Sequence, residues 1–240
     1  MMRKGDDAGY DRSITMFSPE GRLYQVEYAL EAVRRGTLCI GLKSKAGAAI
    51  ITRKKFSKLM DPATIQKIFR IDQHIGCSIS GLHADSRILV DYARVQCQVH
   101  RLTYNEPVRV QTITRKLADI KQQYSQHGGV RPFGSALLII GVDPDESPRV
   151  MTTSPSGTFW AWKGTAMGRN AEEAREKLNK ILKDDMTLDD LIQTGIQVLK
   201  ESTEEEIENE TIQIGCVDTE SKEFRILEMD EKMKYMNLKE

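Results

Sequence analysis

Residues 10–36 read YDRSITMFSPEGRLYQVEYALEAVRRG and predict an amphipathic helix close to the start of the chain. Ser18-Pro19-Glu20 combines an N-cap residue, a proline suited to the first helical position and an acid near the positive end of the helix dipole. Apolar residues then recur at helical spacing, at Leu23, Val26, Leu30 and Val33. Arg34-Arg35-Gly36 supplies a basic last turn and a terminator. We therefore expect a helix at about 19–35.

Strand and helix signals follow this helix in blocks. Short runs rich in β-branched residues predict strands at 37–42, 48–52, 67–72, 75–80, 136–142, 150–153, 158–162, 165–167, 212–217 and 224–227. Helical spacing predicts helices at 110–126, 171–183 and 188–205, a short terminal helix, and one after Gly81 with Ile88, Leu89, Tyr92, Val95, Val99 and Leu102. Strands and helices do not alternate one by one along the chain, which argues against a doubly wound parallel sheet. The blocks predict an α+β class with stacked antiparallel sheets covered by helices.

Composition narrows the function classes. The chain has 240 residues, and its 35 Lys and Arg balance its 35 Asp and Glu. A formal net charge of zero gives no reason to expect a nucleic-acid or membrane partner. The start, MMRKGDDAGY, lacks the apolar core of a signal peptide, so we expect a soluble, intracellular protein. Without an internal linker, residues 10–240 should form one domain behind a polar, mobile segment at 1–9.

Neither the cysteines nor the histidines form a metal-binding pattern. The four cysteines show no CxxC pair and have no histidine cluster beside them, so we expect buried, reduced thiols at Cys39, Cys77, Cys97 and Cys216. The histidines also lack metal-ligand spacing. His83 and Asp85 suggest a His–carboxylate pair, but their surroundings fit a strand end that enters a helix better. No metal and no cofactor are expected.

Thr37 after Gly36 is the strongest candidate for catalysis. Cleavage after glycine would free a threonine whose amine can act as its own base. Such a nucleophile also needs a lysine, for which Lys67 is placed well, and an acid that orients this lysine. Arg53 stands at the end of the second strand, where the acid should be, and would repel Lys67 instead. A threonine peptidase acting through Thr37 is therefore the alternative reading, and no catalytic residue is assigned.

Four stretches together carry a family resemblance over nearly the whole chain. They are residues 10–36, already quoted, KIFRIDQHIGCSISGLHADSRILVDYAR at 67–94, GGVRPFGSALLIIGVD at 128–143 and SPSGTFWAWKGTAMGRNAEEA at 154–174. In these motifs the chain resembles α-type proteasome subunits. The resemblance implies the four-layer αββα sandwich of N-terminal-nucleophile hydrolases, with an added N-terminal helix. It also implies a subunit that does not cleave, which fits the arginine at position 53.

The resemblance further implies partners and a gate. Subunits of this type form seven-membered α rings that cap rings of β subunits, and unfolded polypeptides enter through the α ring. Residues 1–9 would then close the pore. Four residues match the cluster that holds the open gate: Tyr10, Asp11, Pro19 and Tyr28. The implied location is the cytoplasm, and also the nucleus in a eukaryote, while identical and mixed α rings both remain open.

A second implied site receives the C-terminal tails of a regulatory ATPase, in pockets between neighbouring α subunits. The matching positions are Glu27, Lys67, Gly81 and Leu82. The residues support part of this grouping independently. If Gln73-His74 forms a two-residue hairpin loop, residue 67 pairs with residue 80, which places Lys67 beside Gly81. A lysine can bind a terminal carboxylate, and a glycine lets backbone N–H groups approach it.

Overall fold

The computed structural model describes residues 17–57, 59–127, 129–204 and 207–236. In this part of the chain, ten strands form two five-stranded sheets in which all paired strands are antiparallel. The first sheet has the order β10-β9-β2-β1-β8, with β1 Cys39–Lys43, β2 Gly47–Arg53, β8 Gly164–Met167, β9 Ile212–Asp218 and β10 Arg225–Ile226. The second has the order β3-β4-β5-β6-β7, with β3 Ile68–Asp72, β4 Ile75–Gly81, β5 Ser135–Val142, β6 Pro148–Thr153 and β7 Phe159–Trp162.

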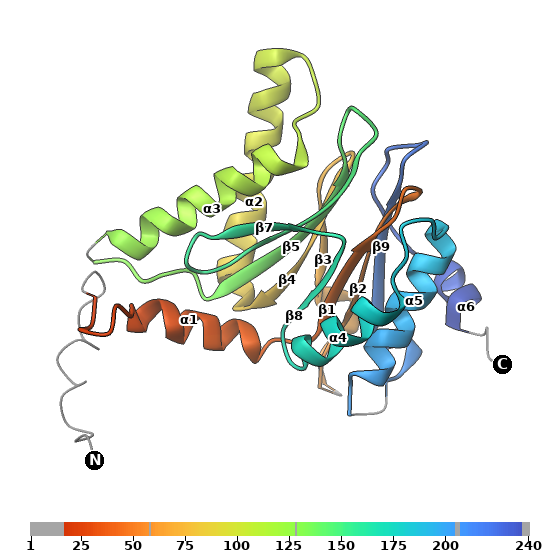
Figure 1. Cartoon of the computed structure of the whole chain (residues 1–240), viewed down its shortest axis with the longest axis horizontal. Helices are drawn as coiled ribbons and strands as arrows, with labels where there is room; N and C mark the ends of the chain where they lie inside the picture. Colours follow the sequence, from red (N-terminus) through yellow and green to blue (C-terminus); the bar gives the residue numbers. More distant parts are fainter. Residues whose placement is uncertain (1–16, 58, 128, 205–206, 237–240) are drawn as a thin grey trace.

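Helices cover the outer face of each sheet. The helices are α1 Tyr24–Arg34, α2 His83–Tyr104, α3 Val110–Gln126, α4 Ala171–Ile181, α5 Leu188–Glu201 and α6 Met229–Met236. Helices α2 and α3 pack on the second sheet, and α4 and α5 on the first (Figure 1). The predicted αββα layering and the added N-terminal helix are thereby confirmed. The ten predicted strands also lie within two residues of the observed bounds.

Strand β5 shows how the sequence produces the layers. Successive side chains of a strand point to opposite faces of the sheet. Leu137 and Ile139 belong to the core under α2 and α3, whereas Leu138 and Ile140 belong to the core between the two sheets. All four are fully buried, and each contributes about 1.5–3 kcal/mol of apolar transfer free energy. A continuous apolar run is what a strand buried on both faces requires.

The predicted start of the first helix at residue 19 is wrong. Helix α1 begins at Tyr24, and a turn precedes it in which the Gly21 N–H donates to the Ser18 carbonyl at 2.8 Å. The Ser18 hydroxyl accepts from the Arg22 N–H at 3.1 Å, so it caps this turn and not the helix. Gly21 has φ +75°, a left-handed conformation that cannot continue a right-handed helix. The predicted end of the helix at 188–205 is also wrong, because α5 ends at Glu201, four residues earlier.

The predicted register of the β3–β4 hairpin is wrong by one residue. Asp72 pairs with Ile75, as a two-residue loop at Gln73-His74 requires, but the register shifts between Arg70 and Asp72. This β-bulge inserts one residue on β3. The Ile79 N–H therefore donates to the carbonyl of Lys67 at 3.2 Å, so that Lys67 lies opposite Ile79 and not opposite Ser80.

A lysine is buried in the core under α3. Lys121 has no exposed surface, and its Nζ donates to the Ser135 carbonyl at 3.0 Å and to the Thr153 hydroxyl at 2.8 Å. Burial lowers the pKa of this amine to about 7, and the nearby Cys77 opposes the shift slightly. A neutral amine has two N–H donors, and both are satisfied here.

Replacing Lys121 with Met should remove a pH dependence of stability. Near pH 7 the folded amine loses its proton, whereas an unfolded lysine keeps its proton up to about pH 10.4. The unfolded state then binds more protons, so the unfolding free energy of the original protein rises by up to about 1.4 kcal/mol per pH unit. Denaturant titrations between about pH 7 and 8 measure both slopes; ionisation of the unfolded cysteines acts in the opposite direction, but both proteins carry the same four cysteines, so this contribution cancels in the comparison. Equal slopes for both proteins would contradict this interpretation.

Candidate functional site

The residue before Thr37 is hydrogen-bonded into the fold on both sides of its backbone. The Gly36 carbonyl accepts from the Arg169 N–H at 2.8 Å, and the Gly36 N–H donates to the Val33 carbonyl at 3.0 Å. A side chain on Gly36 would meet the Ser80 hydroxyl at 2.2 Å, so the end of α1 packs closely on β4. Figure 1 shows α1 ending beside the start of α4. Thr37 thus follows a segment that is part of the packed structure.

A small cavity of about 90 Å³ surrounds Thr37. Its lining residues are Arg35, Gly36, Thr37, Leu38, Arg53, Lys55, Arg169, Asn170, Ser202, Thr203 and Glu204. Strand β2 ends at Arg53, so a cation and not an acid lies near the hydroxyl. Lys67 is not part of the lining. Among the described residues, the lining therefore contains neither Lys67 nor an acid at the end of β2, the two positions considered above for a threonine nucleophile; its lysine and its acid are Lys55 and Glu204.

A second, open groove lies between α1 and the junction of β4 with α2. Its lining residues are Tyr28, Glu31, Ala32, Arg35, Gly36, Gly81 and Leu82. The structure thus brings together Tyr28 from the predicted gate cluster with Gly81 and Leu82 from the predicted activator pocket. Pro19 is exposed in the turn before α1, and Tyr10 and Asp11 lie outside the described residues.

Glu27 does not line this groove. Its carboxylate accepts hydrogen bonds from Nε of Arg22, at 2.7 Å, and from Nη2 of the same guanidinium. The hydrogen bonds with Arg22 lower the pKa of Glu27. The pair is exposed, so solvent screens it and it adds little to stability. Glu27 is therefore held as a carboxylate on the first turn of α1.

Lys67 lies at the start of β3, with its backbone fixed on both sides. Its N–H donates to the Gln213 side chain at 2.9 Å, and its carbonyl accepts from Ile79. The residue is only 4% exposed, yet the hydrogen bonds and ion pairs of the described residues do not involve its ammonium. Desolvation and the positive charge of Lys67 lower the pKa of His83, which places the lysine near the start of α2. Lys67 thus lies close to the start of α2 but does not line the groove that contains Gly81 and Leu82.

Comparison with known proteins identifies the family. Residues 33–217 match the family described as "Proteasome subunit", and residues 10–32 match the N-terminal signature of A-type proteasome subunits. The chain belongs to the proteasome subunit family. It is 46% identical to the "Proteasome subunit alpha" of Methanothermobacter thermautotrophicus over 96% of this chain and 93% of the relative. The proteins of the same name from Sulfurisphaera tokodaii and Pyrococcus horikoshii are 44% and 45% identical, over 93% and 96% of this chain and 94% and 88% of theirs.

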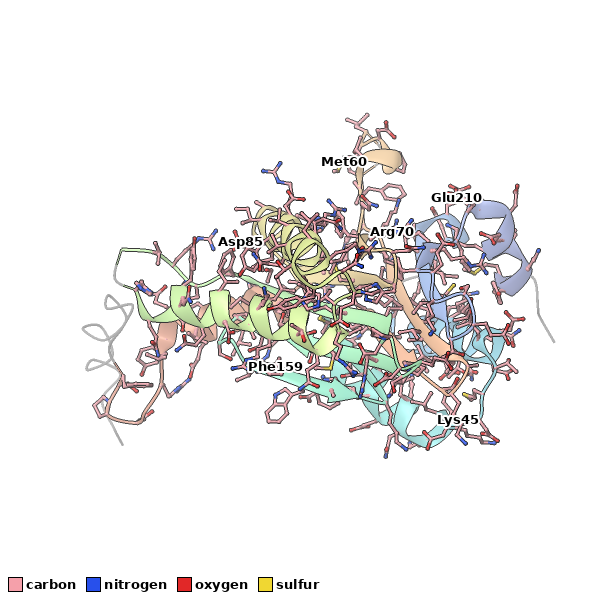
Figure 2. All side chains as sticks on the ribbon, turned by 90° about the horizontal axis from the view of Figure 1, so that it is seen from above. Lys45, Met60, Arg70, Asp85, Phe159 and Glu210 are labelled. Carbon is pink, nitrogen blue, oxygen red and sulfur yellow. The ribbon has the colours of Figure 1, made fainter. Side chains whose placement is uncertain are left out.

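One ion pair near the groove of this proteasome subunit was missed by sequence reasoning. Asp85 accepts from both Nη atoms of Arg131, at 2.6 and 2.7 Å, and from the Gly134 N–H at 2.8 Å. These hydrogen bonds lower the pKa of Asp85, and the contribution of Arg131 is the largest. The pair attaches the segment before β5 to the first turn of α2, on the side of the molecule that carries α1 (Figure 2). Nothing in the sequence indicates a pairing across 46 residues, except that both segments are rich in turn and cap signals.

Helix α2 of the proteasome subunit has two apolar faces. Leu89, Val90, Ala93 and Cys97 are buried on the second sheet. Other apolar side chains of the same helix are exposed: Ile88, Val95, Val99 and Leu102. With the half-buried Tyr92, they are spaced by alternating steps of four and three residues, which is the seam spacing of packed helices. The apolar pattern of α2 therefore includes a face that the described residues leave exposed.

The described residues offer neither a metal site nor a membrane span. No group of three His, Cys, Asp or Glu side chains in this part of the proteasome subunit is arranged to hold a metal ion. None of the helices of the same residues combines the length and the hydropathy needed to cross a bilayer.

Proposed function

We propose that this chain is a non-catalytic α subunit of a 20S proteasome core. In this role it forms the outer seven-membered ring, rests on a ring of β subunits, and admits unfolded polypeptide for degradation in the cytoplasm. The observation that carries the proposal is the environment of Thr37. The residue before it is bonded into the fold, and the acid position at the end of β2 holds Arg53. The family match and the α-type signature support the same role.

The exposed face of α2 supports assembly. Its four apolar side chains are between 46% and 87% exposed and follow one stripe of a 22-residue helix. Exposed apolar patches of this kind mark contact surfaces on soluble proteins. Packing against a helix of another subunit would bury the stripe in the way that seams of two helices do. We therefore assign α2 to a subunit interface.

The gate belongs to the start of the chain. Residues 1–9 close the pore in this proposal, and Tyr10, Asp11, Pro19 and Tyr28 hold the open state. Support from the described residues comes from Pro19, exposed in the turn capped by Ser18, and from Tyr28, which lines the groove beside α1. Pro19 fixes the backbone angle of this turn.

In this proposal the C-terminal tails of a regulatory ATPase bind in a pocket formed by Glu27, Lys67, Gly81 and Leu82. Gly81 and Leu82 line one groove, and Lys67, a residue only 4% exposed, lies close to them near the start of α2. A buried charge without a partner is costly, so an incoming C-terminal carboxylate would be stabilised there. Glu27 lies on α1, one helical turn before Glu31, which lines the groove. A neighbouring α subunit would complete the pocket.

Co-expression of the chain with an archaeal β subunit tests the proposal. The full chain and a variant without residues 1–9 are purified with the β subunit, and native mass spectrometry measures ring composition. We expect α rings that retain the residues before Thr37, no peptide hydrolysis by the α chain alone, and severalfold faster basal hydrolysis for the shortened variant in the complex. A chain that begins at Thr37 and cleaves peptides would establish the alternative threonine peptidase. Unchanged basal hydrolysis in an assembled core would remove the gate from the proposal.

A further inference from the structure

We propose that the cavity around Thr37 is a binding site for a small oxyanion of the phosphate class. The cavity lies where four segments meet: the end of α1, the end of β2, the start of α4 and the end of α5. This inference is independent of the gate and of the activator pocket. It concerns what the site does in a chain that does not use Thr37 for cleavage.

Two hydroxyl groups in the lining have no partner in the described part of the chain. The Oγ1 atom of Thr37 and the Oγ atom of Ser202 are buried from solvent and form no hydrogen bond there. Ser202 as a residue is only 2% exposed. A buried hydroxyl without a partner costs about 1–3 kcal/mol. Two such groups on one cavity indicate a bound acceptor, because one oxyanion accepts from both.

The charge of the lining selects an anion. Among the described residues of the lining, Glu204 is the one acid and four side chains are cationic: Arg35, Arg53, Lys55 and Arg169. Arg53 and Lys55 also take part in other interactions. Arg35 forms an ion pair with Glu31, in which the Arg35 Nε atom lies 3.2 Å from the Glu31 carboxylate. The guanidinium of Arg169 takes part in none of the hydrogen bonds or ion pairs among the described residues, and only its backbone N–H is engaged. Guanidinium groups bind phosphate oxygens through two parallel hydrogen bonds.

Helix α4 adds a further contribution. Asn170, which precedes this 11-residue helix, lines the cavity, and its side chain donates to the Ser202 carbonyl at 3.0 Å instead of capping the helix. The first N–H groups of a helix attract anions. Glu172 and Glu173 in the first turn reduce this attraction, so the helix end assists the cationic side chains and does not replace them.

The size of the cavity indicates a free ion and not a phosphorylated macromolecule. Its volume of about 90 Å³ is several times the ~10–15 Å³ that one water needs, which leaves room for one tetrahedral oxyanion. Inorganic phosphate is therefore the probe. A planar monocarboxylate such as acetate has less charge and fewer acceptor oxygens to meet two hydroxyls and a guanidinium, so it should bind less well.

Thermal unfolding and calorimetry of the full chain in phosphate test this site at constant ionic strength, balanced with sodium chloride. We expect phosphate to raise the Tm saturably and acetate to have little effect. Ser202→Ala and Arg169→Gln should weaken the phosphate affinity by about tenfold or more, which corresponds to at least about 1.4 kcal/mol. Arg115→Gln is the matched control, since it removes the same charge from an exposed position on α3, a helix that does not line the cavity, and should bind phosphate as the original chain does.

Ser202→Ala also separates a binding role from a purely structural one. Without phosphate, this variant should be as stable as the original chain or more stable, because it removes a buried hydroxyl that has no partner. The inference is overturned if phosphate produces no saturable shift. It is also overturned if the two cavity variants respond as Arg115→Gln does, or if acetate acts as strongly as phosphate.

Discussion

Replacing Gly81 with Ala should destabilise the chain by about 3 kcal/mol or more, measured by denaturant unfolding. Gly81 has φ +103°, a conformation that residues with a side chain rarely adopt. A Cβ atom there would also meet the Gly134 carbonyl oxygen at 2.2 Å. That oxygen is fixed, because it accepts from the Leu82 N–H at 2.8 Å, so the end of β4 would have to move away from β5.

Gly21→Ala is the matched control for this prediction. Gly21 also has a positive φ, of +75°, but no atom lies within 4 Å of a Cβ built on it. The control therefore carries only the conformational cost, about 1–2 kcal/mol. Similar losses for both variants would mean that the close approach of Gly134 has no energetic weight. A larger loss for Gly81→Ala would show that the close approach of the Gly134 carbonyl adds to the conformational cost.

The layers of this fold could be predicted from the sequence, because burial determines the pattern of its strands. Every side chain of β5 is buried, and a run of that kind has few other structures available. The errors lie where the conformation of a single residue determines the strand register or the start of a helix. The bulge between Arg70 and Asp72 and the left-handed Gly21 each depend on local geometry that the apolar pattern does not contain. One inserted residue was enough to place Lys67 opposite a different neighbour.

Helix α2 shows a second limit of sequence reasoning. Its apolar residues at helical spacing predicted the helix correctly, but they belong to two faces. Leu89 contacts the core of this chain, whereas Val95 and Leu102 are exposed on it. Both kinds of residue produce the same periodicity, so the sequence cannot distinguish a core from a surface that another subunit would cover. The contact between Asp85 and Arg131 escaped prediction for a related reason, since it joins two segments that only the tertiary fold brings together.

Exchanging Lys67 for Met should reduce ATPase-stimulated peptide hydrolysis by about tenfold or more, while the ring still assembles and basal hydrolysis is unchanged. The backbone on both sides of Lys67 is held by Gln213 and Ile79, so the exchange removes the ammonium without moving the strand. Met keeps most of the apolar length that is buried at this position. The loss would therefore come from the missing charge at the proposed carboxylate site.

Lys67→Arg and Lys45→Met complete the experiment. Arginine retains the charge but has a wider, planar head group, and we expect it to restore only part of the stimulation in this buried place. Lys45 is exposed at the opposite end of the molecule from α1, so its exchange for Met should change nothing (Figure 2). Stimulation of the original core by the ATPase should also fall as the salt concentration rises, because ions screen a contact made by a lysine ammonium. Stimulation of the Lys67→Met core equal to that of the original core would show that activator tails bind elsewhere, and the proposed roles of Glu27, Gly81 and Leu82 would lose their support with it.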